Sequence, residues 1–362
     1  MKEIKPIKIA ILSCNHGHAK AYYCLKNDPL FELVGCSVEP DYRDKIFIER
    51  LDGVPLYDTD EELYENHPEI EAVIIASANI KHMEQFRVAA KKGLHIFSMK
   101  IPTFDLEEYS EMERLAEENG IVCQVELEMR EHPELYRVKE LIESGALGEI
   151  LSINMMNYSH NPVWWRPWQC DPEESYGKKI PLYEGGELYR GGALADHPHV
   201  FDCIRFLTGS SFDTVYAEVA PNLREGVQTE DMIRVMGRLK SGAIFSIDPS
   251  YANDEMHVEK MTDWQKYPRC VEVTMNIVGT KGTLLADLYG KPFNRQSKSG
   301  NGYYLSGAPG SVGLWDKRMQ DFYDCIRGGE KPPVDLKAHR ESIEAMLAAY
   351  ESVSTGKIIK MK

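Results

Sequence analysis

The turn from Ser13 to Ala19 has the position and the residue types of a phosphate-binding segment. It reads SCNHGHA and follows a short apolar run at residues 7–13. In an open parallel sheet, such a strand-to-helix turn brings backbone N–H groups to a phosphate at a helix N-terminus. One glycine is present, and two other residues replace glycines of a G-x-G-x-x-G pattern. We therefore predict a dinucleotide phosphate site, with a plain tight turn as the alternative. The predicted binding residues are Ser13, Asn15, His16, Gly17 and His18.

Glu39 is a second candidate binding residue, because it ends the apolar run at residues 31–38. An acidic side chain at this place accepts hydrogen bonds from the hydroxyls of an adenosine ribose and disfavours a 2′-phosphate. Glu39 therefore predicts NAD as the cofactor, with NADP less favoured. A helix-capping role for Glu39 is the alternative.

Apolar runs alternate with helical patterns through the first third of the chain. The runs lie at residues 7–13, 31–38, 71–76, 94–99 and 121–127. This alternation predicts βαβ units and a doubly wound α/β Rossmann domain over residues 1–128. From about residue 148, long strands joined by tight turns predict an open, mainly antiparallel sheet in an α+β domain over residues 129–362. We expect one helix at about 196–208 and a final helix at about 336–354, which can pack back on the N-terminal domain.

Composition excludes several classes of protein. The formal net charge of −15 argues against a nucleic-acid partner, whose phosphates would be repelled. We find no apolar run long enough to span a membrane and no cleavage site typical of a signal peptide. The eight cysteines are scattered without a C-x-x-C pair, which indicates reduced thiols and a cytoplasmic protein.

The segment ASANIKHMEQFRVAAKKGLHIFSMKIPT, which begins at Ala76, resembles the Gfo/Idh/MocA family (glucose–fructose oxidoreductase, inositol dehydrogenase and MocA). That family has T-P-N-x-x-H, then A-L-x-x-G-K-H-V, then E-K-P. The resemblance continues through GGALADHPHVFDCIRFLTG and NIVGTKGTLLAD to the closing helices. Two departures are the altered glycine loop and Met99-Lys100-Ile101 in place of Glu-Lys-Pro. The spacing from Asp196 to His199 is also shortened.

The resemblance implies an NAD(P)-dependent oxidoreductase that moves a hydride between the nicotinamide and a secondary alcohol of a sugar, cyclitol or glycoside. In such a site Lys100 polarises the substrate oxygen, His199 accepts its proton and Asp196 orients the histidine. An unperturbed imidazole, with a pKa of about 6.5, suits proton transfer at neutral pH. The resemblance also implies a homodimer or homotetramer. The cofactor contacts that it adds are Ser77, Ala78, Asn79, His82 and Lys100.

A loop at residues 160–190 is rich in tryptophan, proline and charge. Its aromatic faces could stack on a sugar, with polar contacts from His160, Trp165 and Arg166, so we predict a substrate role beside Lys100, Asp196 and His199. The loop's own small core is an equal alternative. Metal binding by the histidines near residues 16–18 and 196–199 is a weaker alternative, and we predict no metal.

Two other functions compete with a dehydrogenase. One is a redox-neutral, NAD-dependent glycoside lyase or hydrolase, which would oxidise a glycoside transiently and return the hydride. The other is a non-catalytic sensor that binds a sugar or a dinucleotide, since a fold alone does not guarantee chemistry.

Overall fold

The computed structural model describes residues 5–14, 16, 18–41, 48–160, 178–222, 227–253, 271–290, 293–296, 302–306 and 314–362. The chain divides into two compact units. Unit 1 comprises residues 1–126 and 313–340, and unit 2 comprises residues 127–312 and 341–362. The chain first passes from unit 1 to unit 2 after residue 126, close to the domain boundary expected at residue 128. The sequence-based division did not place residues 313–335 in unit 1, and it expected only that the final helix can pack back on the N-terminal domain.

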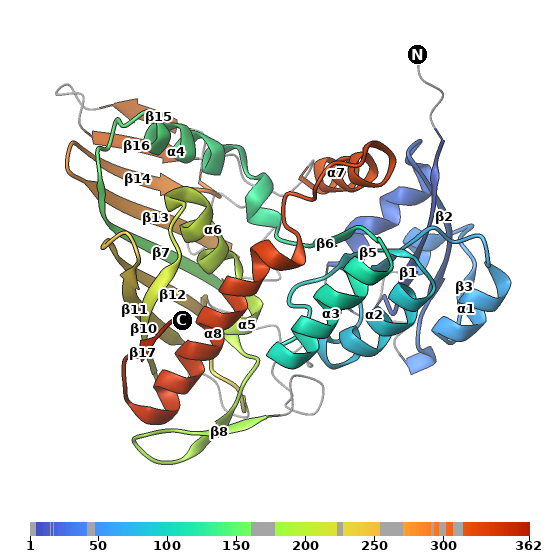
Figure 1. Ribbon diagram of the computed structural model, residues 1–362, viewed down its shortest axis with the longest axis horizontal. Coiled ribbons are helices and arrows are strands. Elements are labelled where there is room, and N and C mark those ends of the chain that lie inside the picture. Colours follow the sequence, from blue (N-terminus) through green and yellow to red (C-terminus); the bar gives the residue numbers. More distant parts are fainter. Residues whose placement is uncertain are drawn as a thin grey trace. The chain divides into compact units, whose positions relative to one another are not determined.

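Unit 1 contains a six-stranded parallel sheet in the order β3-β2-β1-β4-β5-β6 (Figure 1). The order reverses direction between β1 and β4, which is the switch point of a doubly wound sheet. The strands β1, β2, β4, β5 and β6 are mostly buried, as the apolar runs predict, and β3 is half-buried. The strands are β1 (Ile7–Leu12), β2 (Phe31–Ser37), β3 (Leu56–Tyr57), β4 (Ala72–Ile75), β5 (His95–Ser98) and β6 (Cys123–Val125).

Two helices of unit 1, α1 and α3, begin at side chains that cap them. The hydroxyl of Thr59 accepts a hydrogen bond from the Glu62 N–H at 3.1 Å, and Asp105 accepts from the N–H groups of the first turn of α3. Such caps satisfy amides that the helix itself leaves unpaired. The segment after β1, which has a helical pattern, is a 3₁₀ helix. The helices are η1 (Ala19–Asn27), η3 (Ile48–Leu51), α1 (Asp60–Asn66), η4 (Asn79–Lys81), α2 (His82–Lys91), α3 (Leu106–Glu118) and α7 (Leu314–Gly328).

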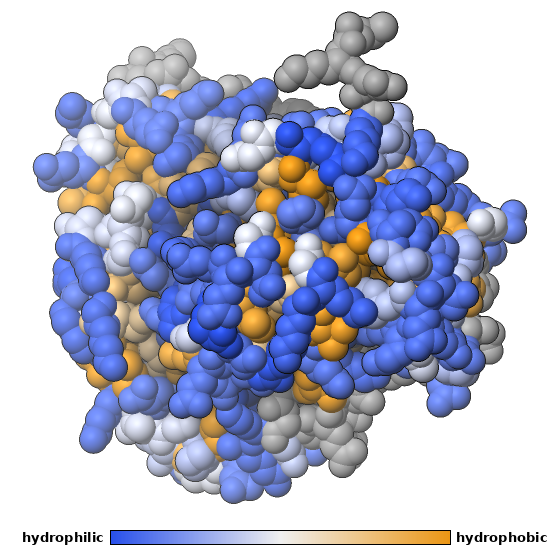
Figure 2. Space-filling view, turned by 45° about the vertical axis from the view of Figure 1, so that its right-hand side comes forward, coloured by the Kyte–Doolittle hydropathy of each residue, from blue (hydrophilic) through white to orange (hydrophobic). Residues whose placement is uncertain are grey.

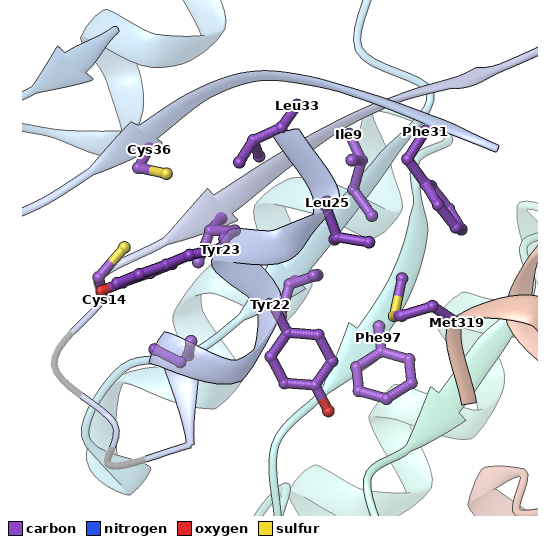
Figure 3. Close-up of a cluster of buried hydrophobic side chains, with 14 of the residues drawn as sticks. Ile9, Cys14, Tyr22, Tyr23, Leu25, Phe31, Leu33, Cys36, Phe97 and Met319 are labelled. Atoms are coloured by element: carbon purple, nitrogen blue, oxygen red, sulfur yellow. The ribbon is translucent and has the colours of Figure 1, made fainter. Parts of the chain in front are cut away.

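The returning helix α7 is part of the core of unit 1. Tyr22 and Leu25 of η1, Phe97 of β5 and Met319 of α7 belong to one buried cluster (Figure 3). The Phe97 ring centroid lies 5.3 Å from that of Tyr22 and 5.5 Å from that of Phe322. Each such side chain contributes about 1.5–3 kcal/mol when it is buried. Unit 1 is therefore completed by residues that follow most of unit 2 in the sequence.

Unit 2 contains a nine-stranded sheet in the order β15-β16-β14-β13-β7-β12-β11-β10-β17. The pairs β7–β12 and β14–β16 are parallel and the other described pairs are antiparallel, so the expected open, mainly antiparallel sheet is confirmed. A separate hairpin joins β8 to β9. The strands are β7 (Ile150–His160), β8 (Lys179–Pro181), β9 (Glu187–Tyr189), β10 (Phe212–Val219), β11 (Ile233–Leu239), β12 (Ile244–Asn253), β13 (Val271–Gly279), β14 (Thr283–Asp287), β15 (Phe293–Gln296), β16 (Gly302–Ser306) and β17 (Ile359–Lys360).

The helices α4, α6 and α8 lie over one face of this sheet (Figure 1). The final helix α8 has the expected extent and is followed by Gly356, whose φ of 65° is the left-handed conformation typical of a helix C-terminus. Its first residues, 336–340, group with unit 1 and the rest with unit 2. The helices of unit 2 are η5 (Glu128–Glu131), α4 (Pro133–Glu143), α5 (Ala193–Asp196), α6 (His199–Thr208) and α8 (Leu336–Thr355).

The prediction of a single helix at about 196–208 is wrong in one respect, because the structure has two helices in this region. α5 ends at Asp196, and α6 begins at His199 after Pro198. A proline disfavours the helical conformation of the residue before it, and His197 has φ −117° and ψ 51°. The hairpin of β8 and β9 differs from the sequence-based expectation, which had a loop over residues 160–190.

Hydrophilic residues dominate the visible face in the space-filling view, and apolar residues appear in small patches (Figure 2). Of the described helices, none is both long and apolar enough to cross a bilayer. The cysteines in the described part of the chain are free thiols, five of them buried.

Candidate dinucleotide site and acid–base residues

The turn after β1 keeps a left-handed backbone although serine replaces glycine. Ser13 has a φ of 50°, a conformation that non-glycine residues adopt rarely. The His16 N–H donates to the Ala76 carbonyl at 2.8 Å, which ties the turn to the end of β4. The His18 N–H donates to Nδ1 of His16 at 3.0 Å. Asn15 and Gly17, also expected here, lie outside the described residues.

A hydrogen-bond network connects the ends of β1 and β2 with the starts of α1 and α2. The Ser13 N–H donates to Oγ of Ser37 at 2.9 Å, and the Ser37 hydroxyl donates to the carboxylate of Asp60. The Gln85 amide donates to the other oxygen of Asp60 at 2.7 Å. Burial raises the pKa of Asp60 in spite of these two donors. The sequence analysis did not single out Ser37, Asp60 or Gln85. The rule that ligands meet the carboxyl ends of parallel strands was the one signal that could have found them.

Glu39 has one engaged and one unengaged carboxylate oxygen. Its Oε1 accepts from the Ser13 hydroxyl at 3.0 Å and from Nζ of Lys81 at 2.7 Å. Its Oε2 is buried and has no hydrogen-bond partner. Burial alone would raise the pKa of Glu39, but the hydrogen bond and charge of Lys81 outweigh it and hold this pKa below its ordinary value. An ionised acceptor without a partner costs about 1–3 kcal/mol, which a ribose hydroxyl would recover.

Glu39 lines a cavity of about 240 Å³ at the end of β2 and beside α1 and α2. The charged residues of its wall are mostly carboxylates, which repel a phosphate. This wall suits a ribose diol better than a 2′-phosphate, and so fits NAD better than NADP. The charged wall residues are Glu39, Asp58, Asp60, Glu61, Glu84 and Lys81.

The segment after β4 contains a second buried acceptor. Oδ1 of Asn79 is buried without a hydrogen-bond partner, so it could receive a further polar group of a ligand. The Ser77 hydroxyl donates to Oε1 of Gln85 at 2.7 Å, and Ala78 is fully buried. These contacts join the segment to the network around Asp60. The two orphaned acceptors, Glu39 Oε2 and Asn79 Oδ1, are what a dinucleotide with two riboses would require.

His82 lies in the interior of unit 1, between the turns that follow β4 and β5. Its Nδ1 is 2.9 Å from the Ile101 carbonyl oxygen and its Nε2 is 3.1 Å from that of Ser77. Burial lowers the pKa of His82 to about 4, so the ring is neutral and one of these contacts is an N–H donor bond. The neutral ring can donate to only one of the two carbonyl oxygens, so His82 hydrogen-bonds one turn and is in contact with the other. Lys100, in the second turn, is 5% exposed, and the Lys100–Ile101 peptide bond is cis.

The residues of unit 2 expected to take part in acid–base chemistry lie at the junction of α5 and α6. Asp196, His197 and His199 are all at most 5% exposed. Nε2 of His197 lies 3.1 Å from Oγ of Ser159, and its ring packs edge-on against that of Tyr251. Lys100 belongs to unit 1, whereas Asp196 and His199 belong to unit 2.

A buried carboxyl group, missed by the sequence analysis, holds the start of α5. Oε1 of Glu230 accepts from the Leu194 N–H at 3.1 Å and from the Tyr350 hydroxyl at 2.7 Å. Gly192 is required here, since a Cβ atom would lie 2.2 Å from the Glu230 carbonyl oxygen. Tyr350 also accepts from the Gly191 N–H at 3.1 Å. These contacts fix the segment that continues to Asp196 and His199.

Glu230 is expected to make unit 2 less stable as the pH rises. Burial raises its pKa to about 7, against 4.5 in an exposed chain. Between these values the folded state holds a proton that the unfolded state releases, so the free energy of unfolding falls by up to about 3 kcal/mol. Urea unfolding at pH 5 and pH 8 should show this loss in the wild type and not in Glu230→Gln. The exposed Glu351→Gln serves as the control. Equal pH dependence in all three proteins would contradict the role of Glu230.

The expected sugar-binding residues cannot be placed. Trp165 and Arg166 lie outside the described residues, and for His160 the description covers the backbone at the end of β7. For the metal alternative, the side chains that could hold an ion in the described part of the chain do not include Asp196, His197 or His199. His18 is among those side chains, and its Nδ1 lies 3.3 Å from the carboxylate of Glu126, which also pairs with Arg318.

Residues 7–127 match the oxidoreductase family with an NAD-binding Rossmann fold, and residues 135–285 match the GFO/IDH/MocA C-terminal domain. The chain belongs to the Gfo/Idh/MocA family of oxidoreductases. It is 22% identical over 303 residues to the scyllo-inositol 2-dehydrogenase (NAD(+)) of Bacillus subtilis, covering 81% of this chain and 78% of that protein. It is 29% identical over 152 residues to the 2,7-anhydro-N-acetylneuraminate hydratase of Mediterraneibacter gnavus, covering 42% of this chain and 37% of that protein.

With three of the most similar curated relatives, the match spans between 37% and 56% of those proteins' own lengths. A scyllo-inositol dehydrogenase from Lactobacillus casei, solved with NAD(H) and scyllo-inositol, superposes with a TM-score of 0.74. That match covers 98% of this chain and 99% of the other, at 18% identity. At this identity the likeness establishes the fold, including both of its domains.

Proposed function

We propose that the protein is an NAD-dependent dehydrogenase acting on a secondary alcohol of a sugar, cyclitol or glycoside. The observation that carries the proposal is the buried, unpartnered Oε2 of Glu39 beside an acidic cavity. A carboxylate at the end of β2 is placed to accept the hydroxyls of an adenosine ribose. The family and the names of its dehydrogenase relatives supply the reaction class.

The cofactor would be held entirely by residues of unit 1. Glu39 would bind the adenosine ribose, the turn that follows β1 would hold the pyrophosphate, and Asn79 and Lys100 would contact the nicotinamide half. The acidic wall excludes a 2′-phosphate, which makes NAD the preferred form. When bound, the nicotinamide supplies the hydride acceptor for the alcohol carbon.

The remaining chemistry is a proton transfer by residues of this chain. Lys100 donates a hydrogen bond to the substrate hydroxyl oxygen and stabilises negative charge on it as the proton leaves. His199 accepts that proton, and Asp196 orients the imidazole. The substrate itself would be a small carbohydrate or polyol, with contacts from the segment at residues 160–166.

A redox-neutral reaction is the second candidate function. It is favoured by the 29% identity to a hydratase, the highest identity to a relative with a named activity among those compared above. In that case the hydride would return to the substrate within one turnover, and the altered glycoside would accumulate without net NADH.

Native mass spectrometry of the purified protein, followed by absorbance at 340 nm with NAD and a panel of sugars, cyclitols and glycosides, tests the proposal. NADH formation with one substrate is the expected result. Bound NAD with an altered glycoside and no net NADH would favour the redox-neutral reaction. Failure to bind any dinucleotide would overturn both and leave a sugar sensor as the best explanation.

The same spectra would measure the oligomeric state, which we propose to be a homodimer or homotetramer of a cytoplasmic protein without a nucleic-acid partner. The sheet face opposite α4, α6 and α8 exposes apolar side chains. Met236, Ile244 and Leu285 are each 43–52% exposed. Cross-strand pairing places Met236 opposite Ser246 of β12, and Leu285 opposite Asn276 of β13, on this one face. Exposed apolar side chains that share one sheet face are suited to contact with a second copy of the chain.

A further inference from the structure

Lys81 is the one cation among the residues that line the cavity beside Glu39 in the described part of the chain. It ends η4 and immediately precedes α2, so its backbone is fixed by two helical segments. Its Nζ lies 2.7 Å from Oε1 of Glu39. The two side chains are 42% and 27% exposed, and both line the cavity.

The ion pair determines which oxygen of Glu39 remains for a ligand. Lys81 and the Ser13 hydroxyl both donate to Oε1, and Oε2 is left without a partner. A carboxylate held from one side in this way has lost much of its rotational freedom before a ligand arrives. Preorganisation of this kind increases affinity, since the ligand does not have to order the side chain.

The ion pair also determines whether the ammonium group of Lys81 can bind a ligand phosphate. While Glu39 is ionised, the charge of Lys81 is balanced by the carboxylate, and four further acidic residues line the cavity wall. Without the Glu39 carboxylate, a compact cation would face the position of the ribose 2′ substituent. A basic side chain near the adenosine ribose is the usual partner of a 2′-phosphate in dinucleotide-binding folds.

We infer that Lys81 is a specificity-determining residue of the dinucleotide site. Paired with Glu39 it orients the carboxylate for a ribose diol, and released from Glu39 it binds a 2′-phosphate. This inference rests on the proposed function, because it requires a dinucleotide in the cavity. It assigns the choice between NAD and NADP to the pair rather than to Glu39 alone.

Isothermal titration calorimetry with NAD and with NADP tests the pair without any substrate. Lys81→Met should weaken NAD binding by about 5- to 20-fold, the loss expected when a charged hydrogen bond no longer orients the acceptor, and should leave NADP excluded. Glu39→Gln should weaken NAD and strengthen NADP by at least about tenfold. The double variant Glu39→Gln/Lys81→Met should not show the increased affinity for NADP that is expected of Glu39→Gln alone. Lys91→Met, which replaces an exposed lysine at the other end of α2, is the matched control and should bind as the wild type does.

The outcomes separate this inference from the proposed function. A wild-type protein that binds neither dinucleotide would overturn the proposed function. A wild type that binds NAD, together with Lys81→Met that binds it equally well, would overturn the inference alone. So would an equal affinity for NADP in Glu39→Gln with and without Lys81. Circular dichroism of each variant establishes that it is folded.

Discussion

Alanine at position 199 or at position 100 is expected to lower kcat by a factor of about 10²–10⁴, the usual contribution of one general acid–base group. His199 is the proposed proton acceptor and Lys100 the proposed donor to the substrate oxygen. Neither change should alter the affinity for NAD by more than a few fold, because Glu39 and its network are untouched. Steady-state kinetics on the substrate found by the panel, with calorimetry of NAD, separates the two effects.

His197→Asn is the matched control for His199. The His197 ring already contacts the Ser159 hydroxyl and packs on Tyr251, a structural use that predicts a loss of stability rather than of turnover. Lys100→Arg is the control for charge, since it keeps the cation and changes its shape. Undiminished turnover in His199→Ala or in Lys100→Ala would remove that residue from the mechanism, and a larger loss in His197→Asn would exchange the roles of the two histidines.

The sheet of unit 1 could be predicted because its strands are buried on both faces. Buried strands appear in the sequence as short, uniformly apolar runs, and the helices between them have caps such as Thr59 and Asp105. The strand β3 was invisible, since Leu56–Tyr57 is too short to form a pattern. The return of α7 to unit 1 was also invisible. It depends on Met319 and Phe322 meeting Tyr22 and Phe97, and no local signal encodes such a distant contact.

The site was predictable to a similar extent. Glu39 could be found because its place at the end of an apolar run defines its place in the sheet. Lys81 could not, because a lysine at the start of a helix is normally solvated, and only the fold brings it to Glu39. Glu230 is a comparable case. Glu230 lies between two strands, and no sequence motif surrounds it. Its role follows from its contacts with Tyr350 and Gly192, which are far from it in the sequence.

Removal of one member of the Glu126–Arg318 ion pair is expected to destabilise unit 1 by about 3–5 kcal/mol, the usual loss when a buried charge is left without its partner. The Glu126 side chain is fully buried and that of Arg318 is 2% exposed. Glu126 follows β6 and Arg318 lies on α7, so their ion pair fastens the returning helix to the sheet. Urea unfolding of Glu126→Gln and Arg318→Met measures the loss.

The double variant Glu126→Leu/Arg318→Met tests whether the ion pair adds net stability to unit 1 or whether each charge only compensates the burial of the other. Two apolar side chains leave no buried charge, so the double variant should recover most of the stability lost in either single variant. Arg114→Met, which breaks an exposed ion pair on α3, should show no measurable loss of stability.

Because the second carboxylate oxygen of Glu126 lies 3.3 Å from Nδ1 of His18, the single variants should also weaken NAD binding through the turn after β1. Single variants as stable as the wild type would show that α7 is held by its apolar contacts alone.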